Sequence, residues 1–438
     1  MFDKLKKNKV INNAIWIIIG KVAQSLLALV IGMLTARYMG PSNYGLISYA
    51  ASLVAFVVPI MNLGLSNVLV QEYTNHKEEE GEIFGSAIII SIISSVFCIF
   101  SLLLFTIYFD TNQPETHLIV FLYSIMLIFQ ACELVEYWFQ AKFLSKYVAV
   151  SSFLAYGIVS IYKIFLLLTS AEVFWFAVSN SIDYFLMTIF LVLTYKKMGG
   201  RRFNFSFKVS KRMLSNSKHY VISSLMITIF AQTDRIMLKG MVGEEAVGFY
   251  TAAVTCASIS QFVFGALIDS MRPSIFIYKR DNDVLNYEES IKCLYCIIIY
   301  LALIQSITMT CLAQYILAFL YGAEYNSAVD ILKISVWYTT FSYMGTVRNI
   351  WILAEGKQMY LWIVNLGGAL VNVILNWVLI PCYGACGAAI ASVITQFFAN
   401  ILINYLVWPL RYNNTLIVES LNPIRLFNIK VENKHTKQ

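Results

Sequence analysis

The chain alternates long apolar runs with short polar breaks from residue 11 to residue 409. Each run supplies the roughly 20 mostly apolar residues that a helix needs to cross the hydrocarbon core of a bilayer. The runs do not alternate polar and apolar residues, as membrane-spanning strands do, so we expect helices. About twelve transmembrane helices are predicted, at residues 11–37, 43–71, 83–109, 117–140, 147–170, 172–195, 216–240, 245–271, 290–320, 327–354, 359–381 and 384–409.

Composition supports an integral membrane protein. Of 438 residues, 59% are hydrophobic and only 13% are charged, which is too little polar material to cover a soluble globule of that size. The basic start and the first apolar run do not form a signal peptide, because the run is too long and lacks a small-residue cleavage site before Arg37. We therefore treat it as the first transmembrane helix.

The distribution of lysine and arginine orients the predicted helices. Of the 32 basic residues, 25 fall on one side of the predicted membrane, and the other side holds only Arg37 and Lys239. Because basic loops stay inside, both termini are expected in the cytoplasm. The net charge of +7 is therefore a signature of topology, and no nucleic-acid partner is predicted.

A polar connector near the middle of the chain divides the predicted helices six and six. It contains two adjacent glycines and is rich in basic residues. We expect an N-terminal six-helix bundle, the cytoplasmic connector, a C-terminal six-helix bundle and a basic cytoplasmic tail, at residues 1–196, 197–215, 216–409 and 410–438 respectively.

A weak internal repeat supports this division. Residues 40–50 and 243–253 both carry Gly, Gly and Ala at offsets 0, 5 and 10, and both copies follow the first predicted helix of their half. An even number of helices per half gives both halves the same orientation. The predicted fold is therefore an all-α membrane protein of two six-helix bundles related by a parallel pseudo-two-fold repeat, with a substrate site near mid-membrane.

Five basic residues fall within predicted spans. A charge facing lipid costs about 2.5–3.5 kcal/mol on insertion scales, so such side chains are expected to face the bundle interior or a water-filled cavity. Two of the five lie near the ends of the tenth helix, where long side chains can instead reach the interface. The candidate residues of a cationic cavity are Lys21, Lys163, Arg235, Lys333 and Arg348.

Acidic residues also lie within the spans, at different depths. Such a carboxylate can take a proton or change its partner during transport, which would couple transport to an ion gradient or form a gate. Structural ion pairing is the competing interpretation, and packing between helices is the corresponding one for the Ser, Thr, Asn and Gly positions that accompany the charges. The candidate coupling or gating acids are Glu133, Glu136, Asp183, Asp234 and Asp269.

Neither enzymatic chemistry nor a metal site is predicted. The four histidines fall in loops, tails or helix ends, and no span presents a nucleophile beside a base. The eight cysteines lie mostly within apolar spans, and no histidine or carboxylate is spaced to complete a zinc site with them. We expect no catalytic residue, no metal and no cofactor.

Several short segments occur in an order that resembles a known family. One is Glu136-Tyr-Trp-Phe-Gln140 at the end of the fourth helix. The others are residues 36–45, 62–65, 146–147, 234–238, 247–253, 321–325, 372–376, 379–384 and 387–389. Over essentially its whole length the chain resembles the O-antigen and exopolysaccharide (Wzx-like) flippases within the MATE-like transporter group. It departs from them at residues 141–143, where the family normally has a glycine, and this weakens any transfer of function to that inner turn.

This resemblance implies a function and its partners. The expected activity is export of an undecaprenyl-diphosphate-linked oligosaccharide from the inner to the outer leaflet of a bacterial or archaeal cytoplasmic membrane. Alternating access of the two halves, coupled to an ion gradient, would drive it. Basic residues in the spans would hold the diphosphate by charge-assisted hydrogen bonds. Candidate protein partners are a polysaccharide polymerase and a chain-length regulator, beside the membrane lipids.

Three alternatives remain at this stage. A multidrug or cation antiporter of the same architecture would favour acids over bases in its cavity. A membrane-embedded enzyme of glycan assembly would need a nucleophile and a base that the spans do not present. A scaffold in the glycan-assembly complex, without transport, would still support surface glycan after every charge in the spans had been removed.

Overall fold

The computed structural model describes residues 2–423, with side chains described from Gln24 onward except that of Leu26. Within this range every regular element is a helix, as the apolar runs predict. The all-helical prediction is therefore confirmed for the described part of the chain. By the contacts between residues, the chain divides into two compact units, Met1–Gly248 and Phe249–Gln438.

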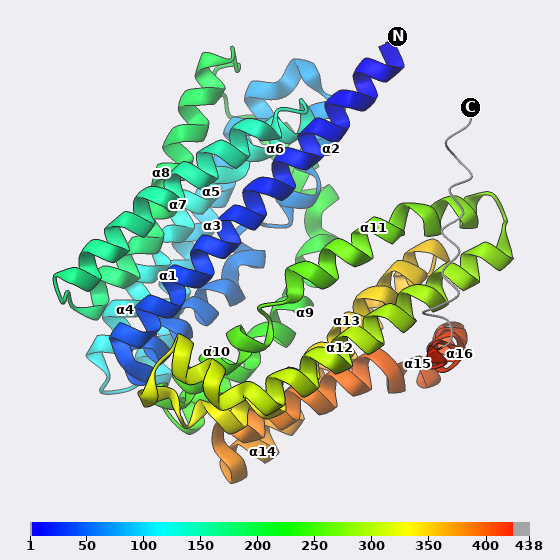
Figure 1. The fold of residues 1–438 in the computed structure, drawn as a ribbon. Coiled ribbons are helices and arrows are strands. Elements are labelled where there is room, and N and C mark those ends of the chain that lie inside the picture. The colour runs from blue at the N-terminus through cyan, green and yellow to red at the C-terminus, as the bar shows by residue number, and fades with distance from the viewer. Residues whose placement is uncertain (1, 424–438) are drawn as a thin grey trace. The chain divides into compact units, whose positions relative to one another are not determined.

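The first unit consists of long helices and short connecting turns. In Figure 1, α7 and α8 run alongside each other, and α7 also packs against α1. Its helices are α1 (Phe2–Met61), η1 (Leu65–Asn67), α2 (Leu69–Asn75), η2 (Lys77–Glu79), α3 (Glu80–Phe109), α4 (Pro114–Ser124), α5 (Met126–Cys132), η3 (Glu133–Val135), α6 (Glu136–Ala141), α7 (Ser145–Leu168), α8 (Val173–Lys197), α9 (Phe207–Met241) and the start of α10 (Glu244–Ala257).

The second unit is built around α12, α13 and α14, which pack side by side in sequence order. Its core is rich in aromatic side chains, with Trp351 and Tyr295 almost fully buried. Its helices, after the end of α10, are α11 (Gln261–Arg280), α12 (Val284–Leu320), η4 (Ala323–Tyr325), α13 (Ala328–Ala354), η5 (Gln358–Tyr360), α14 (Leu361–Phe397), η6 (Phe398–Leu402), α15 (Ile403–Leu406), η7 (Trp408–Leu410) and α16 (Arg411–Ser420).

Among residues 2–423, eight helices are long and apolar enough to cross a membrane, or nine if the bent pair α10 and α11 is one span. Two of these eight contain two helices joined across a kink, because Gly40 in α1 and Gly384 in α14 have non-helical φ and ψ. The kinks lie at or beside the predicted breaks between spans 11–37 and 43–71 and between spans 359–381 and 384–409. Both glycines have positive φ, which L-residues with side chains rarely adopt. The protein is a multi-pass membrane protein, and the count of twelve stays a prediction.

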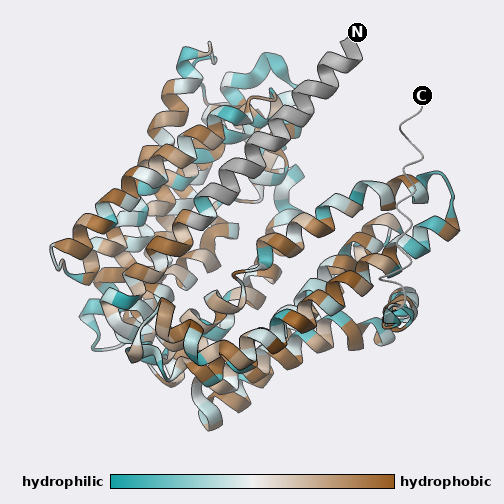
Figure 2. Cartoon of the chain, in the orientation of Figure 1, coloured by the Kyte–Doolittle hydropathy of each residue, from teal (hydrophilic) through white to brown (hydrophobic). Residues whose placement is uncertain are grey.

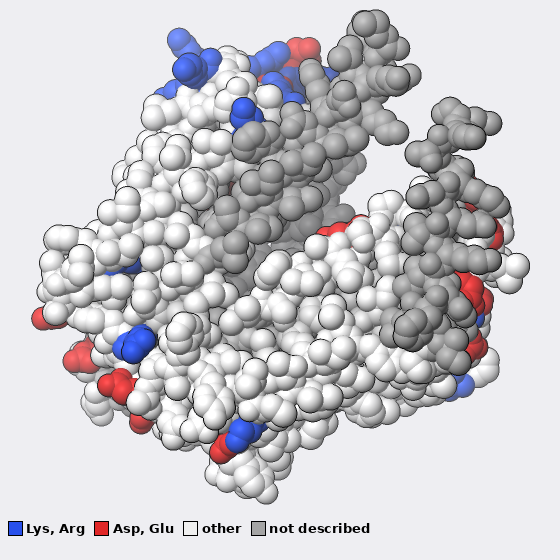
Figure 3. All heavy atoms as spheres, in the orientation of Figure 1, with Lys and Arg blue, Asp and Glu red and all other residues white. Residues whose placement is uncertain are grey.

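The surface of the helices matches a lipid environment. Large apolar side chains such as Phe97, Leu168 and Phe319 are more than half exposed, and Figure 2 shows hydrophobic residues along most of the length of the helices. On the face seen in Figure 3, Lys and Arg side chains gather at one end of the first unit, and most of the described surface between its ends is free of charge. Exposed apolar surface on this scale needs a membrane to cover it.

Hydroxyl groups join the helices of the first unit from within. Ser95 of α3 donates to the carbonyl of Leu127 at 3.0 Å, and Thr188 of α8 donates to that of Phe129, also at 3.0 Å. Such small polar residues permit close packing and bond across helix interfaces in membranes. The contacts of these two hydroxyl groups are those expected of residues that pack helices together.

The first part of the predicted connector lies across the start of α3. The amide of Asn204 donates to the carbonyl of Gly81 at 3.1 Å, and the amide of Ser206 donates to the Ser86 hydroxyl at 2.9 Å. A Cβ on Gly85 would lie 2.3 Å from the carbonyl oxygen of Asn204. From Phe207 onward the chain is already in α9. The first part of the connector is thus hydrogen-bonded to α3 through Asn204 and Ser206, and the rest of it is the start of α9.

The two copies of the glycine repeat touch each other inside the first unit. A Cβ on Gly45 would lie 1.8 Å from the carbonyl oxygen of Glu244, and a Cβ on Gly248 would lie 1.9 Å from that of Pro41. Each contact joins the second glycine of one copy to the residue that follows the first glycine of the other. The backbones approach so closely that only glycine fits.

Candidate functional site

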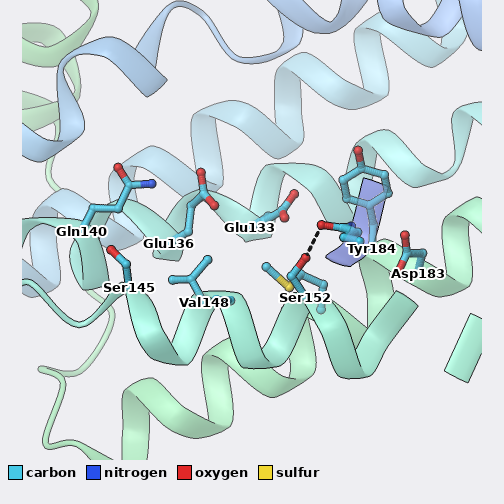
Figure 4. A pocket seen from close by; sticks show the side chains of 11 residues that line it. Glu133, Glu136, Gln140, Ser145, Val148, Ser152, Asp183 and Tyr184 are labelled. Atoms are coloured by element: carbon cyan, nitrogen blue, oxygen red, sulfur yellow. Dashed lines mark hydrogen bonds between the residues drawn. The ribbon is translucent and has the colours of Figure 1, made fainter. Parts of the chain in front are cut away.

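The first unit encloses a polar cavity of about 470 Å³. It lies between the segment that runs from α5 to α6, the first half of α7, and α8, with a single contribution from α1 (Figure 4). The polar residues that line it are Gln24, Glu133, Glu136, Gln140, Ser145, Ser152, Asp183 and Tyr184.

An interruption of the fourth apolar run creates one wall of this cavity. The run is divided into α4, α5, the 3-10 turn η3 and α6, so its backbone is irregular at Glu133. Irregular backbone at membrane depth is tolerated where it is buried in protein or lines a water-filled cavity. Glu133, Glu136 and Gln140 follow at steps of three and four residues, so they share one face of the segment and point into the same space (Figure 4).

The opposite wall comes from α7, α8 and α1. Ser145 and Ser152 project from α7, and Asp183 and Tyr184 lie on α8 (Figure 4). The Ser152 hydroxyl donates to Oε1 of Gln24 in α1 at 2.8 Å. This bond holds the amide of Gln24 against the cavity and joins α1 to α7.

The cavity is acidic. Three of the five predicted acids, Glu133, Glu136 and Asp183, line it together. Lys163, further along α7, lies close enough to Asp183 for the two to attract each other electrostatically. A buried site with three carboxylates cannot keep them all charged without cations, because like charges repel strongly at low dielectric. The arrangement therefore suits a proton or a cation more directly than an anion.

The remaining predicted bases do not line this cavity. Arg235 of α9 donates to Oε1 of Gln232 at 3.3 Å. Lys333 of α13 is exposed and donates to Oδ1 of Asp330 at 2.9 Å. Lys21 lies in α1, and its side chain is outside the described residues.

Arg348 is buried within the second unit, with 3% of its surface exposed. Its guanidinium donates to the carbonyl of Ala399 in the π-helical segment η6 and to Oδ1 of Asn349. The π-helical turn widens the helix and frees carbonyl groups, so a buried donor at this position holds α13 to η6. A role of Arg348 in substrate binding stays a prediction.

The two other predicted acids lie elsewhere. Asp234 is buried in α9, ten residues before Glu244, whose carbonyl oxygen faces Gly45. Asp269 of α11 is exposed and pairs with Arg272 one turn further on, at 2.9 Å. The structure thus gathers Glu133, Glu136 and Asp183 and leaves Asp234 and Asp269 apart from them.

A model of the polysaccharide biosynthesis protein family matches residues 10–279, which is more than half of the chain and includes every residue that lines the acidic cavity. The chain belongs to this family.

Two relatives of this polysaccharide biosynthesis protein extend the similarity over nearly the whole chain. One is the capsular polysaccharide biosynthesis protein CapF of Staphylococcus aureus, 21% identical over 406 residues that cover 90% of this chain and 98% of the relative. The other is a putative O-antigen transporter of Shigella flexneri, 22% identical over 422 residues, or 91% and 97% of the two chains.

Solved structures define the fold. A structure described as the lipid II flippase MurJ in an inward closed conformation matches with a TM-score of 0.69 at 16% identity, over 93% of this chain and 91% of the other. An inward-facing multidrug resistance MATE family transporter of the MOP superfamily matches with a TM-score of 0.68 at 14% identity, over 90% and 96%. The polysaccharide biosynthesis protein therefore has a MATE-like fold.

The family-like segment at residues 136–140 contributes directly to the site. Glu136 and Gln140, its first and last residues, both line the cavity. Sequence reasoning did not single out Ser145 or Tyr184, which carry no charge themselves and lie next to the charged residues Lys146 and Asp183. The polar spacing of α7, with Ser145, Ser152 and Lys163, is the signal that leads to Ser145.

Proposed function

We propose that this protein is a flippase that moves an undecaprenyl-diphosphate-linked oligosaccharide from the inner to the outer leaflet of the cytoplasmic membrane. The observation that supports it most is the match of residues 10–279 to the polysaccharide biosynthesis protein family, in a chain whose cavity at an interrupted membrane helix could bind a coupling ion. Transporters with discontinuous helices bind substrate and coupling ions where the helices are interrupted. The names of the capsular polysaccharide and O-antigen relatives point to the same class of substrate.

We assign the carboxylates of the cavity to ion coupling. Glu133, Glu136 and Asp183 would take up a proton or a cation, and Lys163 would compete with that ion for Asp183. The diphosphate would meet basic side chains instead, and Lys21, Lys163, Arg235, Lys333 and Arg348 are the proposed contacts. Because Lys163 belongs to both sets, binding of the ion and binding of the diphosphate would affect each other.

Alternating access needs a point about which the two halves turn. The reciprocal contact of Gly45 with Glu244 and of Gly248 with Pro41 has the symmetry expected at such a point in a parallel repeat. It supports two six-helix bundles that turn about this contact and open the site to one side at a time. The placing of both termini in the cytoplasm rests on the distribution of lysine and arginine. A polymerase and a chain-length regulator would accept the product, and the flippase itself would make or break no covalent bond.

A cation antiporter is the second candidate, and the acidic cavity is the observation that favours it. Both functions predict that the acids are needed, so the substrate separates them. Proteoliposomes that contain the purified protein and fluorescent undecaprenyl-diphosphate-linked oligosaccharide report flipping by loss of protection from a membrane-impermeant quencher. An antiporter would instead accumulate a cationic dye and leave the lipid in its original leaflet.

Removing the charge of Asp183 is expected to reduce flipping at least about tenfold, because the change removes the carboxylate that Lys163 attracts and so the competition between ion and base. The variant Asp183→Asn keeps the shape of the side chain and the protein should still insert. The initial rate of flipping in proteoliposomes, with and without a pH or sodium gradient, is the measurement.

Asp281→Asn is the matched control. Asp281 is exposed beside Arg280 and is outside the cavity, so the same chemical change there should leave the rate as it is. If Asp183→Asn flips at the wild-type rate and keeps the dependence on the gradient, the coupling role of the cavity is wrong.

A further inference from the structure

A second, smaller cavity of about 140 Å³ lies within the second unit. One wall is a face of α13, and the other is the junction of α10 and α11. In contrast to the acidic cavity of the first unit, all of its lining residues are uncharged, and most carry a hydroxyl or an amide. They include Ser258, Gln261, Tyr338, Thr339, Ser342 and Thr346.

The cavity is positioned at an interrupted helix. α10 ends at Ala257 and α11 begins at Gln261, with a bend of 42° between them. Nε2 of Gln305 donates to the carbonyl of Ala257 at 3.1 Å and so satisfies a group that the interruption releases. Interrupted membrane helices are maintained where the backbone lines a cavity or a binding site. The bend is therefore explained if this cavity takes a polar occupant.

Polar side chains gather around the Tyr343 hydroxyl at this junction. Ser260, Gln305 and Thr339 all lie within hydrogen-bonding reach of this hydroxyl. Tyr343 is only 6% exposed and lines the cavity. Hydroxyl groups both donate and accept, so this cluster can exchange its internal hydrogen bonds for bonds to a ligand that also does both.

The aromatic ring of Tyr343 is held in place by packing. It stacks on Phe264 of α11 with ring centroids 3.9 Å apart and planes 14° from parallel. The hydroxyl therefore keeps its position beside the cavity without an occupant. A rigid donor and acceptor of this kind reduces the entropy lost on binding.

The lining identifies the chemical class of the ligand. A charged group would lose its hydration in this neutral cavity without gaining an opposite charge, at a high cost. A sugar ring is uncharged and presents several hydroxyls that donate and accept at once. We propose that this cavity binds one neutral sugar of the lipid-linked oligosaccharide, an inference that rests on the proposed flippase function and deepens it. The volume limits the occupant to a single ring.

Binding of defined lipids to the full-length protein tests this assignment. The probes are undecaprenyl diphosphate, the same lipid carrying glucose, and the same lipid carrying glucuronic acid, each measured by native mass spectrometry in detergent. Two or three added hydrogen bonds should make the glucose lipid bind about tenfold tighter than the bare lipid. The glucuronic acid lipid should gain nothing, because its carboxylate meets no cation.

Two variants separate the cavity from general damage. Tyr343→Phe removes one hydroxyl, and Gln261→Leu replaces an exposed amide, so both should fold. Each should bring the glucose lipid to within about twofold of the bare lipid and leave binding of the bare lipid unchanged. Tyr300→Phe is the matched control, since the Tyr300 hydroxyl donates to the carbonyl of Leu421 and is outside the cavity.

The outcomes distinguish this inference from the proposed function. If wild-type protein binds all three lipids equally, or if both variants keep the gain from glucose, the cavity holds water only and the inference is wrong while the flippase function stands. Equal gains from glucose and glucuronic acid would overturn the neutral class of ligand. If wild-type protein binds none of the three lipids, the flippase function and the sugar site fail together.

Discussion

Gly248→Ala lowers the stability of the protein by about 3 kcal/mol or more and stops transport, because the added Cβ has no space. It would lie 1.9 Å from the carbonyl oxygen of Pro41 and 2.8 Å from the carbonyl carbon. A backbone group cannot rotate away as a flexible side chain can, so the two segments must separate. Thermal unfolding in detergent and flipping in proteoliposomes measure the two effects.

Gly240→Ala is the matched control for this result. Gly240 lies in α9 only a few residues away, and a Cβ there would meet nothing within 4 Å. Because alanine favours helix over glycine by up to about 1 kcal/mol, this variant should be as stable as the wild type or slightly more stable. An equal response of Gly240→Ala and Gly248→Ala would contradict the proposed backbone contact.

The reciprocal geometry predicts how two such changes combine. A Cβ on Gly45 would lie 1.8 Å from the carbonyl oxygen of Glu244, in the same region of contact. Once Gly248→Ala has pushed the segments apart, Gly45→Ala should cost much less than it does alone. If the losses of stability from Gly248→Ala and Gly45→Ala instead add within about 0.5 kcal/mol, the two sites are independent and the support for a shared pivot is removed.

The fold class follows from the sequence because it depends on long-range averages. The length of the apolar runs and the helical spacing of the polar residues within them are sufficient to predict membrane helices. The exact number of spans depends on local backbone geometry at Gly40 and Gly384, where one residue decides whether a helix turns or continues. A hydropathy pattern contains no φ angle, so it places the breaks near these glycines without giving the geometry of the kink.

Part of the candidate site could also be predicted from the sequence. The spacing of Glu133, Glu136 and Gln140 predicts one polar face, and the structure places that face in the acidic cavity. Spacing alone does not say which helix lies opposite, so it grouped Lys333 and Arg348 with Lys163 as cavity bases. The structure pairs Lys333 with Asp330 one turn earlier in α13, a local contact that spacing alone could predict. It packs Arg348 against η6, which is a contact set by tertiary packing.

The neutral cavity shows what charge-based reasoning misses. Its residues recur at Thr339, Ser342, Tyr343 and Thr346, a hydroxyl-rich pattern that sequence alone assigns to helix packing. Only the interruption before Gln261 and the cavity beside it distinguish it from packing. Both are properties of three-dimensional structure.

Arg212→Gln will destabilise the first unit by roughly 2 kcal/mol, because it leaves a buried carboxylate without its cation. Glu72 of α2 is 5% exposed and accepts from Nε of Arg212 at 3.0 Å and from Nδ2 of Asn216 at 3.1 Å. Removing one member of a fully buried pair costs about 3–5 kcal/mol. The smaller value applies here because the Arg212 side chain stays 27% exposed and water partly replaces it.

A double variant separates the lost attraction from the stranded charge. Arg212→Gln with Glu72→Gln removes both charges, so it should recover most of the stability that Arg212→Gln loses. Arg280→Gln is the control, since Arg280 and its partner Asp281 are largely exposed and that pair should not affect the apparent Tm. Because Arg212 joins α9 to α2, recovery in the double variant would identify the charge of Glu72, rather than the shape of the contact, as what holds these helices together. If the double variant is as unstable as Arg212→Gln, the guanidinium stabilises the unit by packing or through its bond to Glu79 at 2.6 Å, and the charge of Glu72 is incidental.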